Sequence, residues 1–199
     1  MKAAALLAAL ACLLLSPVTA VRATEGPAAP DRAFAEVMAM FAARTHGHVA
    51  FTEIHELAML KTPLRSSGEL VYVAPDLLEK HTLEPKPETL ILDHGVLKAE
   101  RGRHKYSIAL ADAPQVLPFV ESVRATLAGD AEALERYFVV RFEGDAAHWR
   151  MMLTPRDPAL ARSVSEIRLE GERAAILNVE VRERDGDRTV LSIGPELPR

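Results

Sequence analysis

Short apolar runs separated by short turns dominate the chain between residues 48 and 110, and this pattern restricts the folds open to it. The breaks are rich in glycine, proline, serine and aspartate, and the runs cover 48–61, 69–73, 78–84, 89–93, 96–101 and 105–110. Short runs of period two with such breaks are typical of consecutive hairpins. The segment therefore predicts an antiparallel meander.

The first of these runs is longer than the others and its apolar phase is not constant. Val49 and Phe51 are two apart, but the next apolar residue is Ile54. A slip of one residue near Glu53 and Ile54 predicts a β-bulge or strong curvature at that point.

Helical periodicity appears on both sides of the meander. Residues 31–44 follow the N-cap residue Asp31 and predict an amphipathic helix. A second helix is expected over 112–127, since Val116, Leu117, Val120, Val123 and Leu127 share one face; 131–136 and 155–162 are expected to be short helical segments. Further strands are predicted over 137–143, 149–153, 165–170, 174–182 and 189–193. The hairpin turn Asp185-Gly186-Asp187 precedes the last of them.

The order of these elements defines the fold class. About ten or eleven strands and two or three helices, with only hairpin-type links between strands, indicate an α+β domain. We expect one large curved antiparallel sheet with the helices packed against its concave face.

The N-terminus has the features of a secretory signal peptide. Lys2 precedes an uncharged apolar run that ends at Leu15, and small residues follow. The run is about a dozen residues, whereas a permanent membrane span needs roughly 20. We expect cleavage near Ala20 or Ala23, a flexible lead-in over 24–30, a single domain over 31–199, and export to the periplasm.

Charge and cysteine content limit the possible partners of the chain and the ways in which its fold can be stabilised. The net charge of −4 and the absence of a basic stripe argue against a nucleic-acid partner. The one cysteine, Cys12, lies inside the predicted signal peptide. The mature chain would therefore have no disulfide and would depend on its core for stability.

The order and spacing of several short strings resemble the LolA-like family of periplasmic lipoprotein carriers. The resemblance extends from about Phe34 to Pro195. The strings are Phe51-Thr52-Glu53, Gly68-Glu69-Leu70-Val71-Tyr72-Val73-Ala74-Pro75, Pro85 followed by Leu90 to His94, Trp149-Arg150-Met151-Met152-Leu153-Thr154-Pro155, and Asp185-Gly186-Asp187-Arg188-Thr189. The family fold is an unclosed β-barrel with a helical lid, which agrees with the fold predicted from periodicity.

The resemblance implies transport without chemistry. Such a carrier accepts an acylated cargo, a lipoprotein or another lipid-linked molecule, from an inner-membrane exporter or releasing complex. It then delivers the cargo to an outer-membrane acceptor. We expect a monomer with no cofactor and no metal. The residues expected to contact cargo are Phe51, Leu70, Tyr72, Leu78, Leu90, Leu92, Tyr106, Ile108, Met151 and Leu153, with Lys80 toward a cargo headgroup.

Two departures from the family pattern bear on the cargo. Ala74 stands where the lipoprotein carriers usually have an arginine that holds the lid closed. The third and fifth strands, over 78–82 and 97–100, lack the aromatic residues that those carriers place there. These departures indicate a divergent branch whose cargo is another acylated lipid, such as a pigment ester, a glycolipid or a glycerolipid.

Two alternative functions remain open at this point. Glu53 and His55 are two apart on a predicted strand and form a possible acid–base pair for a secreted hydrolase or accessory subunit. A scaffold that uses a sheet edge is the other. The discriminating feature is the largest pocket: an apolar lining favours the carrier, and converging carboxylates and histidines favour the enzyme.

Overall fold

The structure is a computed structural model that describes residues 29–113 and 117–198. The predicted signal peptide and most of the predicted lead-in lie outside these residues. Within them, no helix combines the length and the apolar character needed to cross a membrane.

One antiparallel sheet of eleven strands organises the described part of the chain, in the order β6-β5-β4-β3-β2-β1-β11-β10-β9-β8-β7. Its strands are β1 His46–Glu56, β2 Leu64–Val73, β3 Leu77–Glu84, β4 Glu88–Asp93, β5 Val96–Arg101, β6 His104–Ala109, β7 Phe138–Gly144, β8 Trp149–Pro155, β9 Val164–Glu172, β10 Ala175–Glu183 and β11 Arg188–Glu196. Only the β1–β11 pair joins strands that are distant in the sequence. Because β6 and β7 are the two ends of the order, the sheet is unclosed, as predicted.

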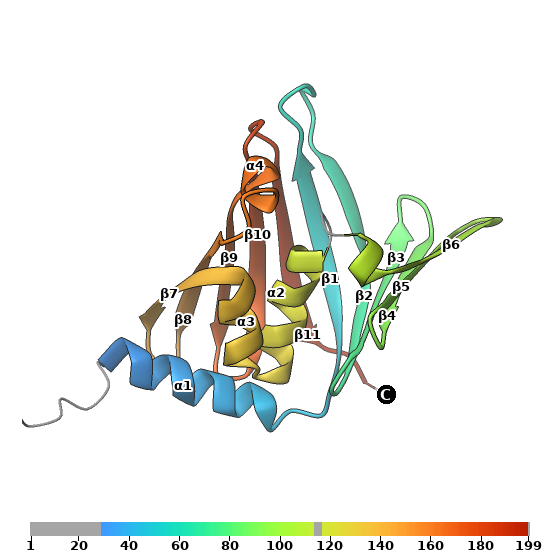
Figure 1. Cartoon of the computed structure of the whole chain (residues 1–199). Coiled ribbons are helices and arrows are strands. Elements are labelled where there is room, and N and C mark those ends of the chain that lie inside the picture. Colours follow the sequence, from blue (N-terminus) through green and yellow to red (C-terminus); the bar gives the residue numbers. More distant parts are fainter. Residues whose placement is uncertain (1–28, 114–116, 199) are drawn as a thin grey trace, which may run out of the picture.

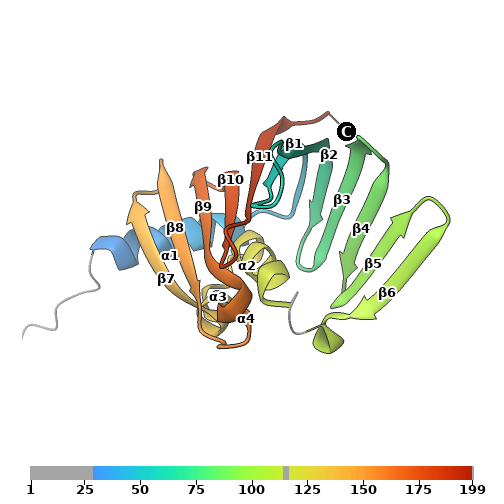
Figure 2. The ribbon, with the colours of Figure 1, turned by 90° about the horizontal axis from the view of Figure 1, so that it is seen from above.

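The helices lie on the inner side of this curved sheet. They are α1 Ala29–Ala42, α2 Leu117–Ala128, α3 Ala131–Tyr137 and α4 Leu160–Ser163, with a 3₁₀ turn at Leu110–Asp112. Viewed from above, the strands form an arc from β7 to β6, and α2 and α3 lie inside the arc (Figure 2). The β5–β6 hairpin extends away from the helices (Figure 1). The predicted α+β class and concave-face helices are therefore confirmed.

A continuous apolar row crosses the inner face of the sheet because the strand register aligns the alternating residues. Met151 pairs with Leu169, and Val179 pairs with both Leu169 and Leu191. Side chains one residue away point to the opposite face, since successive residues of a strand alternate. The period of two in the sequence thus becomes one buried face.

The main hydrophobic core lies between β7–β10 and the helices α1 and α3. Val37, Phe41 and Leu134 are completely buried there. The Phe41 ring meets Trp149 edge to face at 5.7 Å between centroids, a favoured aromatic geometry. The core therefore fills one half of the arc, and it leaves the half formed by β2–β5 without a helix packed directly on it.

Gly129 allows the C-terminal end of α2 to meet α1. Its φ is +67°, and a Cβ atom at this position would lie 2.3 Å from the carbonyl oxygen of Met38 and 2.5 Å from the amide nitrogen of Ala42. A positive φ and so close a backbone approach both require glycine.

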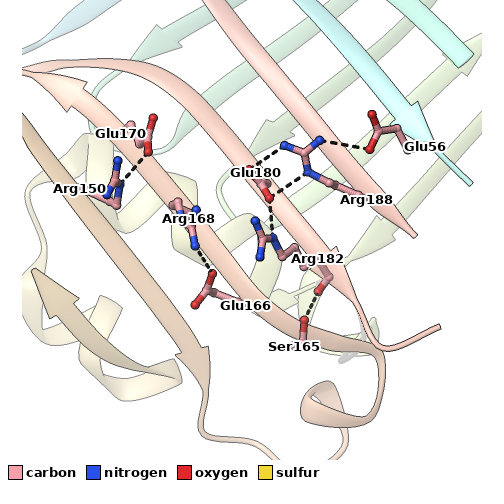
Figure 3. Close-up of polar contacts among 9 residues, drawn as sticks. All are labelled: Glu56, Arg150, Ser165, Glu166, Arg168, Glu170, Glu180, Arg182 and Arg188. Carbon is pink, nitrogen blue, oxygen red and sulfur yellow. Dashed lines mark hydrogen bonds and ion pairs between the residues drawn. The ribbon is translucent and has the colours of Figure 1, made fainter. Parts of the chain in front are cut away.

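The outer face of β8–β11 carries paired charges that alternate with the core residues (Figure 3). Arg150 Nε lies 2.7 Å from Glu170 Oε1, and Arg188 Nε lies 2.9 Å from Glu180 Oε1. The hydrogen bonds from Arg188 and Arg182 lower the pKa of Glu180 to about 2. This face is consequently polar and closely balanced in charge.

Several predicted boundaries and the predicted position of the strand irregularity are wrong. The first strand ends at Glu56 rather than at 61, because the chain turns: the Leu60 amide donates to the Leu57 carbonyl and the Ala58 amide to Asp187. The register irregularity of β1 lies between Val49 and Phe51, where it pairs with β11, and not near Ile54.

The predicted helical segment over 155–162 is mostly not helical. Strand β8 continues to Pro155, and α4 begins only at Leu160. Before α4, the Asp157 carboxylate accepts hydrogen bonds from the amides of Ala159 and Leu160, so it organises a turn. The second predicted helix, over 112–127, corresponds to α2 from Leu117, and residues 114–116 lie outside the described part of the chain.

Candidate functional site

A cavity of about 480 Å³ lies between α2 and the inner face of the sheet. Its walls come from β1–β5 on one side and from β10 and β11 on the other. Six of the predicted contact residues line it: Leu70, Tyr72, Leu78, Lys80, Leu90 and Leu92. The volume falls in the range of small-molecule binding sites.

The register of the meander builds this wall. Leu70 pairs with Val49 and Lys80, and Lys80 pairs with Leu90. Two residues further along each strand, Leu78 pairs with Tyr72 and with Leu92. Two neighbouring rows of side chains therefore point from four strands toward the same space.

Helix α2 covers the cavity with the apolar face that its sequence predicts. Phe119, Val120, Val123 and Leu127 line the space opposite the sheet. Phe119 is 39% exposed, so the cover is incomplete at the N-terminal end of α2. The helix is thus placed as a lid.

Several lining residues were not among the predicted contacts. They are mainly Val49, Leu97, Val179, Leu191 and Ile193, together with the four side chains of α2. The period of two in the last strands marks the residues of β10 and β11 as one face. Their approach to β2–β4 depends on the long-range β1–β11 pairing, which the sequence pattern does not reveal.

The other predicted contact residues lie outside the cavity lining. Phe51 is 2% exposed, and Met151 and Leu153 are fully buried in the core of the other half of the sheet. Tyr106 and Ile108 are 66% and 41% exposed on the edge strand β6. Because they pair with Ala99 and Leu97, they extend the cavity face into solvent beyond α2.

An ion pair lies within the mainly apolar lining. Lys80 Nζ is 2.7 Å from both carboxylate oxygens of Glu53, and Ser66 Oγ donates to Glu53 at 2.9 Å. Lys80 Nζ also lies 5.1 Å from the Phe51 ring centroid. Burial acts to raise the pKa of Glu53, but the hydrogen bonds and the positive charge of Lys80 outweigh it and lower that pKa. Glu53 is therefore ionised and compensates the charge of Lys80.

The remaining charged residues of the lining also have partners. Arg44 pairs with Glu196 at one end of the cavity, and its Nη1 donates to the Ala174 carbonyl at 2.8 Å. Glu79 Oε2 lies 2.6 Å from His81 Nε2. The exception among the polar groups is Tyr72, whose buried hydroxyl has no hydrogen-bond partner among the described residues.

Helix α2 has a polar contact to the sheet. Arg124 of α2 lies 3.3 Å from Asp76, in the turn that follows Ala74 and β2. Glu121 holds the same guanidinium at 2.7 Å. The positive charge is thus on the helix, and one of its acceptors is in the turn after β2.

The geometry around Glu53 and His55 differs from that of a nucleophilic site. His55 Nε2 lies 3.3 Å from Glu53, and its Nδ1 lies 3.1 Å from Thr189 Oγ1. Ser66 donates to the carboxylate and not to the imidazole. A carboxylate paired with Lys80 and having a lowered pKa is a weak proton acceptor. In the described parts of the chain, no group of three or more side chains could hold a metal ion.

An unclosed antiparallel sheet, a helical lid and an apolar cavity between them define a binding protein. The sequence pattern of the family described as outer membrane lipoprotein carrier protein LolA-like matches residues 27–194. The chain therefore belongs to the LolA-like family. Comparison with curated proteins finds none that matches.

Solved structures of low sequence identity are similar to this chain. A LolA superfamily protein from Nitrosomonas europaea has 8% identity and a TM-score of 0.49, covering 87% of this chain and 94% of that one. A domain from Vibrio parahaemolyticus, described as a putative outer membrane lipoprotein-sorting protein domain, has 12% identity and a TM-score of 0.43. The match covers 82% of this chain and 90% of that one. The MucA/MucB complex of Pseudomonas aeruginosa has 16% identity and a TM-score of 0.42, with 83% of this chain and 59% of that chain covered.

Proposed function

We propose that this protein is a periplasmic carrier that shields an acylated cargo in its cavity during transfer from the inner to the outer membrane. The observation that carries the proposal is the apolar cavity between α2 and strands β1–β5, β10 and β11. Membership of the LolA-like family supports it.

Exposure of a hydrocarbon chain to water is costly. Each methylene group in water costs about 0.8 kcal/mol relative to an apolar environment. A long acyl chain therefore crosses an aqueous compartment only when it is covered. Leu70, Leu90 and Leu92 on the sheet and Val120 and Val123 on α2 face the same space and provide such a cover.

The proposed route needs a donor and an acceptor. In this scheme an inner-membrane exporter or releasing complex loads the cargo, and an outer-membrane acceptor receives it. The carrier acts as a monomer and catalyses no reaction. Its cargo is a lipoprotein or another lipid-linked molecule, with Lys80 nearest to a cargo headgroup. Since Glu53 compensates the charge of Lys80, that contact would be a hydrogen bond to a neutral group.

Native mass spectrometry of the mature protein purified from its own cell envelope tests this function, followed by lipid extraction. We expect a bound acylated species on the wild type. The Leu70→Glu variant places a charge in the lining and should lose the species. Leu83→Glu is the matched control on β3, because Leu83 is 53% exposed and lies outside the lining. A wild type without bound lipid, even after acyl lipids and lipopeptides are offered, would contradict the proposal.

A further inference from the structure

The hydroxyl group of Tyr72 is a feature of the cavity that shielding of hydrocarbon does not explain. Tyr72 lines the cavity and is 5% exposed. Its oxygen is buried and forms no hydrogen bond with any of the residues that the structure describes. A buried hydroxyl without a partner costs on the order of 1–3 kcal/mol, and phenylalanine would fill the same space without that cost. The position therefore holds an unsatisfied polar group in the wall of the cavity.

The surroundings of Tyr72 favour its role as a neutral donor. Burial raises the pKa of Tyr72, and the nearby Asp76 carboxylate adds to this effect while Arg124 opposes it. The phenol therefore keeps its proton. Asp76 and Arg124 already contact each other at 3.3 Å, so the two charges are satisfied without the hydroxyl.

The charges of the lining indicate the kind of ligand that fits. The lining cations Lys80 and Arg44 are paired with Glu53 and Glu196, and Glu79 is bound to His81. Among the described residues of the lining, no cation is thus left unpaired for a carboxylate or a phosphate. A ligand inside this cavity is expected to be neutral, because an uncompensated charge in an apolar site is costly.

We infer that Tyr72 donates a hydrogen bond to the carbonyl oxygen of an acyl group in the cargo. This inference rests on the proposed carrier function and adds a selectivity to it. An acyl ester or acyl amide has a strong carbonyl acceptor next to its hydrocarbon chain, whereas an alkyl ether of the same length does not. The cavity consequently selects neutral acyl compounds over alkyl ethers and over free fatty-acid carboxylates.

Matched lipids separate the carbonyl from the chain. We would measure dissociation constants by displacement of a fluorescent apolar probe, using 1-palmitoylglycerol, 1-O-hexadecylglycerol, N-palmitoylethanolamine and palmitate. The wild type should bind the ester or the amide about three- to tenfold more tightly than the ether, the effect of one net hydrogen bond. Palmitate should bind more weakly than the neutral acyl compounds. The tighter of the ester and the amide identifies the acyl linkage that the site accepts.

Tyr72→Phe tests the donor directly. The variant should bind ester and ether with equal affinity, and its thermal unfolding midpoint should not fall, because the removed hydroxyl has no partner in the protein. Tyr106→Phe is the matched control: Tyr106 lies on the exposed strand β6, so that variant should keep the wild-type preference.

The outcomes separate a failure of the proposed carrier function from a failure of the proposed Tyr72 hydrogen bond. If none of the four lipids displaces the probe, the carrier function fails, and the inference fails with it. If the lipids bind but the wild type shows no preference for a carbonyl, only the role of Tyr72 is overturned; this comparison requires no variant. A preference that survives in Tyr72→Phe, or a midpoint that falls by several degrees, also overturns it.

Discussion

Replacing Glu53 with glutamine tests how the cavity accommodates a charge. Lys80 and Glu53 are 24% and 12% exposed and lie 2.7 Å apart. The neutral amide keeps a hydrogen bond to Lys80 but leaves the ammonium without its opposite charge. Removal of one partner from a buried ion pair costs about 3–5 kcal/mol. Because this pair is partly exposed, we expect the free energy of unfolding to fall by a smaller amount, about 1–3 kcal/mol.

The double variant Glu53→Met/Lys80→Met provides the contrast. It replaces both charges with flexible apolar side chains, which adapt readily to irregular space. Replacement of a buried ion pair by apolar residues of similar size is often neutral or stabilising. We therefore expect the free energy of unfolding of the double variant to lie within about 1 kcal/mol of that of the wild type.

Urea denaturation followed by the fluorescence of Trp149, the single tryptophan, measures both variants. Trp149 is 4% exposed in the core and reports global unfolding. The pH dependence offers a second check. The pKa of Glu53 is lowered in the folded state, so its contribution is present above the unfolded pKa and is lost as the pH falls. A double variant less stable than Glu53→Gln would contradict this expectation.

Three further predictions follow from other contacts. Arg124→Gln should make the amides of α2 exchange several-fold faster than in the wild type, because it removes the charged contact between α2 and Asp76. The amides of α1 should keep their exchange rate. An unchanged rate in α2 would show that this contact does not hold the helix in place. Gly129→Ala should lower the free energy of unfolding by at least about 1 kcal/mol, measured in urea, since its φ is positive and its Cβ would meet α1; an unchanged value would contradict this. Glu180→Gln should be less stable than the wild type at pH 7, and the difference should shrink as the pH falls from 4.5 toward 2, because the folded pKa is about 2; a difference independent of pH would exclude this linkage.

The meander could be predicted from the sequence because each hairpin is a local event. The strands from β2 to β6 are linked by short turns, and their alternation places Leu70, Leu78 and Leu90 on one face before any long-range contact is considered. The same local pattern is misleading where a distant residue decides the conformation. Leu57 and Leu60 continue the apolar spacing of β1, but Asp187 binds the Ala58 amide and the chain turns instead.

The cavity itself could be predicted only in part. Its β2–β4 wall follows from periodicity, and the apolar face of α2 is also visible in the sequence. The opposite wall, with Leu191 and Ile193, exists because β11 pairs with β1, a contact between the two ends of the domain. The Glu53–Lys80 pair likewise depends on the register of three strands, so neither residue by itself indicated the other.

Photo-crosslinking with a diazirine-bearing acyl chain on a short lipopeptide tests whether the acyl chain of a cargo occupies the cavity. After irradiation, peptide mass spectrometry locates the labelled residues. The carrier account predicts labels on the sheet at Leu70, Leu90 or Leu92 and on α2 at Val120 or Val123, with competition by unlabelled lipopeptide. Labels confined to the exposed strand β6, or labels that unlabelled lipopeptide does not reduce, would contradict it.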